Sequence, residues 1–311
     1  MIKIGAVTLD TSHPFAFAKI MESIPAMGYT GVFDDSFRGH SEVAEFCERY
    51  RVKRCFSLEE LAQESDIGLI HSCNWSKHLT YAEPFLRLDK PVFIDKPFVG
   101  SLRDCQKAQA LSAQGKKLLG SSSLRYATEI DEFLSIPVAQ RGEILSVYAS
   151  CGVDEFNYGI HIVEGILRLV GSTPLSVQSM ERGARHAVVC ESYQIRFENG
   201  ANALYTISMG IWQPFVFSIL TSKRTYSLPI NSDALYPKLL TEIANALCAD
   251  SSKLATVDEL TLAVQTMLAG KQSRESKGIP VLLTELQEEA AFDGSAFYQA
   301  YRKSAKPIPL D

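Results

Sequence analysis

Apolar residues in the first 120 positions alternate between short continuous runs and helically spaced faces. The runs predict buried parallel strands over residues 2–8, 29–33, 67–70, 91–94 and 117–121. Helical spacing between them predicts helices over residues 14–26, 41–50, 77–88 and 101–114, and a short helix that begins at Leu58. Because strand and helix alternate throughout, this part of the chain favours an α/β fold with a Rossmann-like, doubly wound parallel sheet.

The pattern changes near residue 124. Strands are predicted over residues 142–150, 193–197 and 203–207, the last two joined by the turn Glu198-Asn199-Gly200. Helices are predicted over residues 161–170, 237–248 and 258–269. Strands that gather together, with helices set apart, indicate an α+β domain with a largely antiparallel open sheet. We therefore expect two domains, residues 1–123 and residues 124–311.

Composition excludes several classes of protein. The 311 residues carry a formal net charge of -5, which argues against nucleic acid as a partner. No apolar run is long enough to span a bilayer or to form the core of a signal peptide, so no membrane association is expected. The seven cysteines form no CxxC pair, which fits reduced thiols in a cytoplasmic protein. His71, Cys73 and His78 match no standard zinc spacing, so no metal site is predicted.

Two short clusters carry groups suited to proton and hydride chemistry. Ile94-Asp95-Lys96-Pro97 follows a predicted buried strand, at the sheet edge where open α/β folds bind ligands. Asp95 is expected to hold the Lys96 ammonium, and Pro97 to stiffen the turn. The second cluster is Asn157-Tyr158-Gly159-Ile160-His161. A fixed cation and a titratable imidazole suit removal of a proton from a hydroxyl while a hydride leaves its carbon.

Acidic residues near the second cluster have simpler interpretations. Asp154 and Glu155 are expected to be solvated loop acids. Glu164 lies one helical turn after His161, so it either orients the imidazole or pairs with a base.

The first loop departs from the usual dinucleotide-binding pattern. G-x-G-x-x-G normally stands between the first strand and the first helix, and here only Gly5 is present. Val7 stands where the backbone must approach a pyrophosphate, and Asp10 could bring a carboxylate near the phosphate charges. Taken alone, this loop favours a capped strand-to-helix turn. Three hydroxyl side chains could still donate to an anion at the helix start: Thr8, Thr11 and Ser12.

The second strand ends in two acids. Asp34 and Asp35 stand where a carboxylate can hold the ribose hydroxyls of adenosine, which favours NAD. Arg38 lies close enough in sequence to accept a 2′-phosphate, so NADP remains open.

An ordered set of motifs along nearly the whole chain resembles the family of glucose–fructose oxidoreductase, inositol dehydrogenase and MocA (Gfo/Idh/MocA). The segments that carry the resemblance are Ser72-Cys73-Asn74-Trp75-Ser76-Lys77-His78, Ile94-Asp95-Lys96-Pro97, Leu124-Arg125-Tyr126, Asn157-Tyr158-Gly159-Ile160-His161, Phe197-Glu198-Asn199-Gly200 and Ser276-Lys277-Gly278-Ile279-Pro280-Val281. Aspartate replaces the glutamate of the Glu-Lys-Pro signature, and asparagine replaces the aspartate of the Asp-x-Gly-x-His signature.

This resemblance implies an N-terminal Rossmann domain and a C-terminal domain whose open sheet makes subunit contacts, hence a homo-oligomer, either a dimer or a tetramer. It implies NAD or NADP as cofactor, and oxidation or reduction at a carbinol or carbonyl carbon. The small-molecule substrate would be a sugar, an inositol or a related polyol.

The resemblance also implies roles for individual residues. Lys96 would donate a hydrogen bond to the reacting oxygen, and His161, beside Asn157, would be the general acid or base. Arg125 would contact substrate or cofactor. Asn74 and His78 would lie near the nicotinamide.

The two departures leave alternatives open. The altered loop weakens the expected cofactor site, and Asn157 lacks the charge that would raise the pKa of a neighbouring histidine. One alternative is a binding or regulatory protein that keeps the fold without redox chemistry. Another is a lyase or isomerase that uses the same lysine and histidine.

Overall fold

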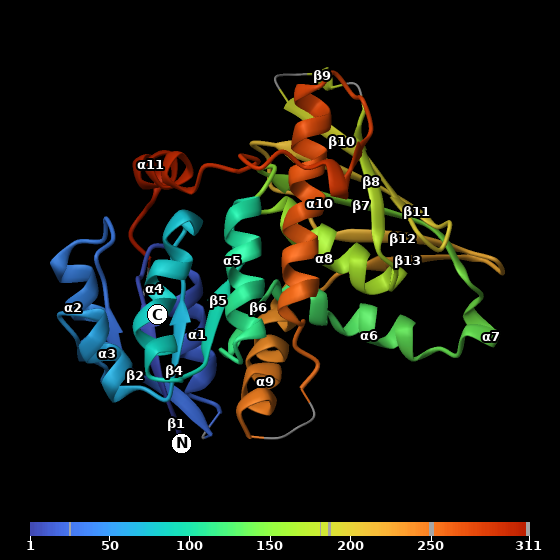
Figure 1. The fold of residues 1–311 in the computed structure, drawn as a ribbon. Helices are drawn as coiled ribbons and strands as arrows, with labels where there is room; N and C mark the ends of the chain where they lie inside the picture. Colours follow the sequence, from blue (N-terminus) through green and yellow to red (C-terminus); the bar gives the residue numbers. More distant parts are fainter. Residues whose placement is uncertain (25, 181, 186–187, 249–251, 309–311) are drawn as a thin grey trace.

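A computed structural model describes residues 1–24, 26–180, 182–185, 188–248 and 252–308. Within these ranges the chain forms two lobes, each built on one sheet (Figure 1). The N-terminal sheet has six parallel strands in the order β3-β2-β1-β4-β5-β6. Its strands are β1 (Ile2–Val7), β2 (Met27–Phe33), β3 (Lys53–Arg54), β4 (Ile67–Ile70), β5 (Val92–Asp95) and β6 (Leu118–Ser121). The helices between them are α1 (His13–Met21), α2 (His40–Tyr50), α3 (Leu58–Glu64), α4 (His78–Arg87) and α5 (Leu102–Ala113), with the 3-10 turn η1 (Trp75–Lys77) before α4.

Strand order reverses between β1 and β4, which makes the carboxyl ends of these strands the topological switch point of the sheet. Open α/β sheets bind ligands there, so the fold directs attention to the loops after β1, β2, β4 and β5. The predicted Rossmann-like parallel sheet is confirmed, and the boundaries of the five predicted strands lie within two residues of those expected, whereas the short edge strand β3 was not predicted.

The second lobe contains an eight-stranded mixed sheet within the described residues, in the order β13-β12-β7-β11-β10-β8-β14, with β9 paired to β10. Its strands are β7 (Ile144–Val153), β8 (Pro174–Ser179), β9 (Gly183–Arg185), β10 (Val188–Phe197), β11 (Asn202–Met209), β12 (Val216–Thr221), β13 (Thr225–Pro229) and β14 (Val281–Leu282). Only the pairing of β7 with β11 is parallel among the pairs that the structure describes. The predicted largely antiparallel sheet is therefore confirmed.

Helices α8 and α10 pack on this sheet, and the other helices after β6 lie at its ends or against the first lobe (Figure 1). The helices after β6 are η2 (Ser123–Tyr126), α6 (Thr128–Ser135), α7 (Val138–Arg141), α8 (Gly159–Val170), η3 (Ser232–Ala234), α9 (Leu235–Cys248), α10 (Val257–Glu275), η4 (Leu283–Glu285) and α11 (Gly294–Ser304). The division expected after residue 123 falls inside η2, and α9, α10 and α11 all return to pack against the N-terminal lobe.

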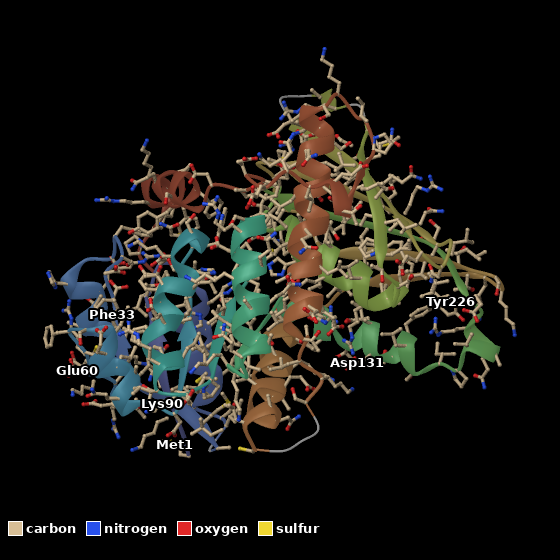
Figure 2. All side chains as sticks on the ribbon, viewed as in Figure 1. Met1, Phe33, Glu60, Lys90, Asp131 and Tyr226 are labelled. Carbon is tan, nitrogen blue, oxygen red and sulfur yellow. The ribbon has the colours of Figure 1, made fainter. Side chains whose placement is uncertain are left out.

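Polar contacts hold the helices of each lobe in place. Lys90 Nζ donates to the carbonyl oxygens of Ala62, Gln63 and Ser65, which caps the last turn of α3 (Figure 2). Asp131, on α6, lies within 4 Å of the cationic groups of Arg168, Lys238 and Lys253 and so ties α6 to α8 and to the second lobe's later segments.

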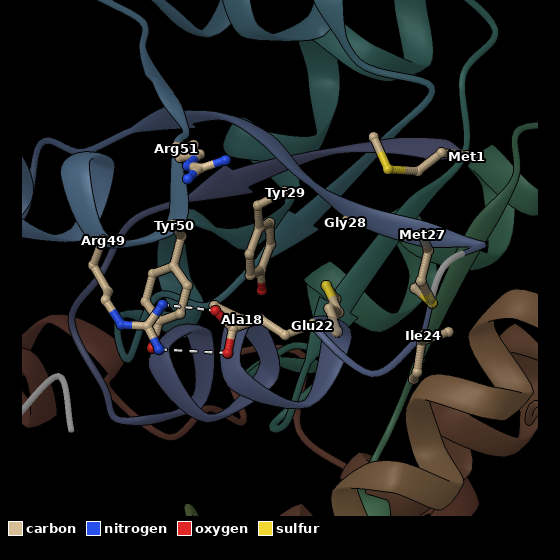
Figure 3. A pocket seen from close by; sticks show the side chains of 11 residues that line it. Met1, Ala18, Glu22, Ile24, Met27, Gly28, Tyr29, Arg49, Tyr50 and Arg51 are labelled. Carbon is tan, nitrogen blue, oxygen red and sulfur yellow. Dashed lines mark hydrogen bonds and ion pairs between the residues drawn. The ribbon is translucent and has the colours of Figure 1, made fainter.

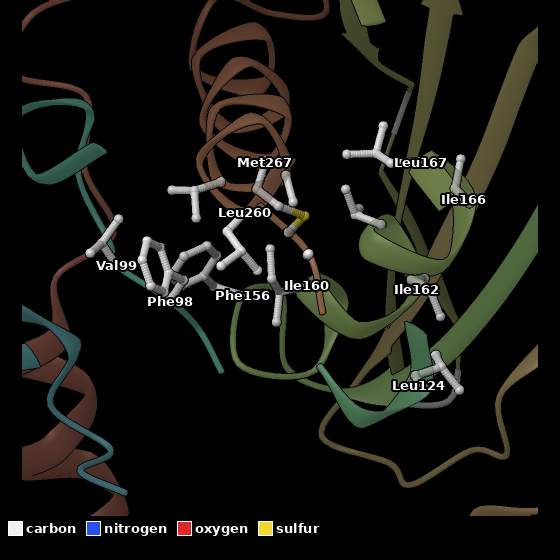
Figure 4. Close-up of a cluster of buried hydrophobic side chains, with 14 of the residues drawn as sticks. Phe98, Val99, Leu124, Phe156, Ile160, Ile162, Ile166, Leu167, Leu260 and Met267 are labelled. Atoms are coloured by element: carbon white, nitrogen blue, oxygen red, sulfur yellow. The ribbon is translucent and has the colours of Figure 1, made fainter. Parts of the chain in front are cut away.

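One hydrophobic core crosses the boundary between the lobes. Phe98 and Val99, which follow β5, are almost fully buried and belong to the same cluster as Phe156, Ile160 and Met267 of the second lobe (Figure 4). Phe156 also stacks on Phe292, with ring centroids 4.2 Å apart. Since one core includes side chains from both sides, the lobes are fixed relative to each other by burial as well as by chain connection.

We expect Phe98→Ala to destabilise the protein by about 3–5 kcal/mol, because it removes a fully buried ring from this shared core. Chemical denaturation measures the change. Phe56→Ala is the matched control, since the Phe56 side chain is 82% exposed and its loss should change stability by less than about 0.5 kcal/mol. Equal effects of the two substitutions would show that residue 98 does not belong to a packed core.

Candidate active site

Asp95 is a buried hub at the carboxyl end of β5. Its Oδ1 accepts the Lys96 amide at 2.8 Å, and its Oδ2 contacts the imidazoles of His13 and His71. Tyr29 OH extends this network, 2.7 Å from His71 Nε2. Burial raises the pKa of Asp95, but the charges and hydrogen bonds of the two histidines outweigh it and hold the pKa well below its usual value. Asp95 is therefore an anion, and its Oδ1 fixes the backbone amide of Lys96.

The Lys96 side chain reaches across to the second lobe. Its Nζ donates to Asn157 Oδ1 at 2.7 Å and lies 3.4 Å from the Asn157 carbonyl oxygen and 5.6 Å from the centroid of the Tyr158 ring. The sequence predicted that Asp95 would hold the ammonium, and here the direct acceptor is instead the Asn157 amide. Burial lowers the pKa of Lys96, and the negative charges of Asp95 and Asp154 oppose that shift.

His161 lies one turn after Asn157, in the first turn of α8, and is 7% exposed. The Tyr158 ring lies between the two predicted catalytic groups, beneath Lys96 Nζ and 5.9 Å from the His161 ring centroid. Burial lowers the pKa of His161 well below its usual value, and the charges of Lys96 and His13 lower it further. Lys96 and His161, far apart in sequence, are thus brought to one junction between the lobes.

The second nitrogen of His161 is fixed by Ser122. Ser122 Oγ lies 2.5 Å from His161 Nδ1 and accepts the Leu124 amide at 3.1 Å. The hydroxyl hydrogen of Ser122 has no other acceptor among the hydrogen bonds that the structure describes, so we assign it to Nδ1, which leaves Nε2 as the N–H of the neutral imidazole. Glu164 does not contact His161 directly. Its carboxylate accepts from Ser121 Oγ and the Ser122 amide, so it supports the imidazole through residue 122.

Arg125 is buried but turned to a different partner. Its guanidinium pairs with Glu259 at the start of α10, and its charge partly offsets the burial that raises the pKa of Glu164. No contact that the structure describes for Arg125 reaches Lys96 or Asn157, so its expected contact with a ligand stays a prediction.

Carboxylates of the chain itself make hydrogen bonds within and beside the loop after β1. Thr8 has a positive φ of 64° and is fully buried, and the Leu9 amide donates to Asp34 Oδ1 at 2.8 Å. Asp10, which is also fully buried, accepts from Ser72 Oγ and the Cys73 amide. The Arg38 guanidinium donates to the carbonyl oxygens of Leu9 and Asp10. A carboxylate thus takes the Leu9 amide, which a phosphate loop would offer to a ligand, and a second carboxylate takes the Cys73 amide of the loop after β4.

Other residues predicted at the cofactor site lie nearby with different contacts. A Cβ on Gly5 would lie 2.6 Å from Ser65 Oγ, so this glycine allows β1 to pack against α3. Thr11 Oγ1 accepts the His13 amide, and Ser12 is the exposed N-cap of α1 with no side-chain cap bond. Asp35 is exposed and accepts from Tyr81 OH and Lys77 Nζ. His78 is fully buried, with its ring nitrogens on the carbonyl oxygens of Ser72 and Phe98.

Helix α11, which the sequence did not predict, lies across these loops (Figure 1). The Trp75 ring contacts Phe297, and its Nε1 donates to the Phe292 carbonyl oxygen at 2.7 Å. Asn74 Nδ2 lies 3.4 Å from Ser295 Oγ. At the other end of the helix, Phe37 packs against Tyr298 and Tyr301. The C-terminal helix therefore covers the sheet edge from the Asn74 side to the adenosine side.

Three buried polar atoms on these loops have no hydrogen-bond partner among the described residues: Thr8 Oγ1, Asp10 Oδ1 and Asn74 Oδ1. They come from the loops on both sides of the topological switch point. Buried polar groups in proteins are normally satisfied, so unpaired atoms here are what a bound ligand with hydroxyl or amide groups would satisfy. The observation fits a ligand at this edge even though two loop amides already have carboxylate partners.

A separate surface pocket of about 440 Å³ lies at the other end of β2 (Figure 3). It is lined by α1, β2 and the end of α2, and two of its charged groups, Arg49 and Glu22, pair with each other. Met27 and Gly28, at the start of β2, line it, whereas Asp34 follows the end of that strand. This pocket is therefore not part of the candidate site.

Comparisons with known proteins agree with this geometry. Residues 13–122 match the sequence model of a family described as an oxidoreductase family with an NAD-binding Rossmann fold, GFO_IDH_MocA. This N-terminal part of the chain is therefore similar to the Gfo/Idh/MocA oxidoreductase family. The match starts at His13, after the loop that departs from the glycine pattern. The match bears out the predicted resemblance for residues 13–122, and the family description agrees with the predicted oxidoreductase class and nicotinamide cofactor.

Individual relatives are distant. The Salmonella typhimurium protein named "Putative oxidoreductase YceM" is 28% identical over 118 residues, which is 38% of this chain and 37% of that protein. The scyllo-inositol dehydrogenase of Lactobacillus casei, solved with NAD(H) and scyllo-inositol, has a TM-score of 0.79 at 14% identity, over 91% of this chain and 99% of that one. A probable dehydrogenase of Thermotoga maritima has a TM-score of 0.77 at 14% identity, over 92% of this chain and all of that one. These structures show that the likeness in fold extends over both lobes.

We expect His161 to make stability depend on pH. The unfolded chain protonates this imidazole below about pH 6.5, whereas burial keeps it neutral in the folded state, so the free energy of unfolding decreases as pH falls. His161→Asn should remove up to about 1.4 kcal/mol per pH unit of this dependence, measured by urea denaturation between about pH 7.5 and 5.5. A His161→Asn profile parallel to the parent's would contradict the neutral, buried imidazole.

Proposed function

We propose that this protein is an NAD(P)-dependent oxidoreductase that acts at a carbinol or carbonyl carbon of a small sugar, inositol or polyol-like substrate. The observation that carries the proposal is the junction of Lys96 with Asn157 and His161, at the carboxyl edge of a sheet of the Gfo/Idh/MocA family. Structural neighbours that bind NAD(H) and an inositol support the substrate class.

The cofactor would be held along the loops after β1, β2 and β4. Asp34 stands at the end of β2, Ser12 caps α1 without a side-chain bond, and Asn74 Oδ1 is unpaired. The nicotinamide would supply or accept the hydride when bound. Asp34 favours NAD, and the Arg38 guanidinium, which is engaged by loop carbonyl oxygens, offers no free group for a 2′-phosphate.

Lys96 and His161 would divide the work at the reacting oxygen. The Lys96 ammonium donates a hydrogen bond to that oxygen, and its lowered pKa makes the amine form accessible for accepting a substrate proton. With Ser122 donating to Nδ1, His161 offers an Nε2–H toward the same oxygen and stays neutral. Proton transfer then falls to Lys96, while His161 orients the substrate. Asn157 Oδ1 accepts a hydrogen bond from the Lys96 ammonium and so holds it in place.

Self-association would use the uncovered face of the second sheet. Tyr148 and Leu204 are register partners on β7 and β11, and Leu220 of β12 pairs with Ser146, two residues before Tyr148; the three apolar side chains are each between 37% and 47% exposed. An apolar centre on a flat sheet face fits a second copy of the chain, so we propose a homodimer or a tetramer. No described helix is long and apolar enough to cross a membrane. The seven cysteines are all unpaired, which supports a cytoplasmic location.

Lys96→Ala should lower kcat/KM by about 10²–10⁴, the usual contribution of a positioned acid or base, without preventing folding. Initial rates with NADH or NADPH and a panel of polyols and their ketones measure the effect, and thermal unfolding checks the fold. Lys107→Ala, at a lysine that lines a surface pocket on α5, serves as the control for loss of a lysine. Full activity of Lys96→Ala would remove this residue from the mechanism. Turnover by the parent protein without any nicotinamide cofactor would favour a lyase or isomerase instead.

Leu204→Lys should convert the oligomer to smaller species, because it places a charge at the centre of the proposed contact. Sedimentation velocity at several protein concentrations measures the mass. Leu88→Lys, at a similarly exposed leucine of the N-terminal lobe, should leave the mass unchanged. A monomeric parent protein, or a Leu204→Lys variant with the mass of the parent, would overturn the proposed interface.

A further inference from the structure

A buried ammonium needs a compensating charge, and the direct acceptor of Lys96 Nζ is a neutral amide. The nearer acid in sequence, Asp95, already uses Oδ1 for the Lys96 amide and Oδ2 for two imidazoles. Asp154 is the other acid whose charge reaches Lys96. The charge that the Asp-x-Gly-x-His pattern would place at residue 157 therefore lies three residues earlier in this chain.

Asp154 also fixes Asn157, whose side chain lies between the Asp154 carboxylate and the Lys96 ammonium. Its Oδ1 accepts the backbone amides of Asn157 at 2.6 Å and Tyr158 at 3.2 Å, and its Oδ2 lies 3.4 Å from Asn157 Nδ2. An Asn157 amide turned the other way would point its NH₂ at an ammonium and its oxygen at a carboxylate. Both contacts would be repulsive, so the carboxylate and the ammonium together allow only one orientation.

We propose that Asp154 is a positioning residue for Lys96, which it controls through the Asn157 amide. The carboxylate holds Asn157 Oδ1 toward Lys96 Nζ and supplies the negative charge that the ammonium lacks in direct contact. This inference rests on the proposed function. Its consequence there is that Asp154 sets both the position of the Lys96 amine and the pH at which the ammonium loses its proton.

Asp154→Asn tests the proposal with little change in shape, because the new side chain keeps an oxygen for the two backbone amides. Its NH₂ would then face Asn157 Nδ2, so the Asn157 amide turns and withdraws its oxygen from the ammonium. With a negative charge removed, the Lys96 pKa should fall further below its usual value. The rising limb of kcat/KM against pH should move to lower pH, and kcat/KM at its plateau should fall about 10–100-fold, as for loss of a group that orients a reacting residue.

The double variant Asp154→Asn with Asn157→Asp is the decisive rescue. It moves the carboxylate into direct contact with Lys96 Nζ and lets the amide at residue 154 donate to it. We expect the Lys96 pKa to rise above that of Asp154→Asn and kcat/KM to recover most of its loss. Asp293→Asn is the matched control, since Asp293 also caps a backbone amide, at the start of α11, but is exposed. It should leave the Lys96 pKa unchanged.

The Lys96 pKa is measured without turnover, by competitive labelling of amines with acetic anhydride across pH, followed by mass spectrometry of the peptide that contains residue 96. An Asp154→Asn protein with the parent's Lys96 pKa, or a double variant that fails to raise it again, would overturn the proposal and reduce Asp154 to a loop cap. If the pKa pattern holds but no variant and no parent protein oxidises or reduces any substrate, the positioning role stands and the oxidoreductase proposal fails.

Discussion

The hydrogen bond from Lys96 Nζ to Asn157 Oδ1 is the contact on which the candidate site depends. It joins the carboxyl end of β5 to the loop before α8, so it exists only when the two lobes are packed as described. An ammonium taken out of water is costly unless its donors are satisfied and its charge is offset. The shared core around Phe98 and Phe156 meets the first condition by holding the loops together, and Asp95 and Asp154 meet the second.

At the same edge of the sheet, contacts within the chain surround a first loop that lacks most of the usual phosphate-binding glycines. Asp10 and Asp34 accept loop amides, Arg38 binds loop carbonyl oxygens, and α11 lies over the result. These contacts stabilise the loop in the absence of the glycines that a phosphate-binding turn normally uses. They also mean that a bound dinucleotide would have to satisfy Thr8, Asp10 and Asn74 at atoms that now have no partner. A hydroxyl-rich or amide-bearing end of a ligand suits those acceptors better than a phosphate beside Asp10 does.

Much of this arrangement could be predicted from the sequence. Short apolar runs locate the parallel strands because strands covered on both faces carry few polar residues. Lys96 and His161 could be found because one follows a strand end and the other sits in a motif of known order. The acceptor of Lys96 could not, since Asp95 and Asn157 compete for it and only tertiary packing decides between them. Asp154 was missed for a related reason. Loop acids are usually solvated, whereas Asp154 accepts the Asn157 and Tyr158 amides and lies within the electrostatic reach of Lys96, which is distant in the chain. Helix α11 was missed because its apolar residues pack against loops of the N-terminal lobe and not against a core within its own segment.

The most direct test of the central claim, a nicotinamide site beside Lys96, is a calorimetric titration of the whole protein with NADH and with NADPH. We predict one saturable site per chain for at least one of the two dinucleotides. Its dissociation constant should be below about 1 mM, the upper end of ordinary KM values. The same ligand should raise the unfolding temperature, because it binds only the folded state. No heat and no shift with either dinucleotide would contradict the account and favour a member of the fold that has given up redox chemistry.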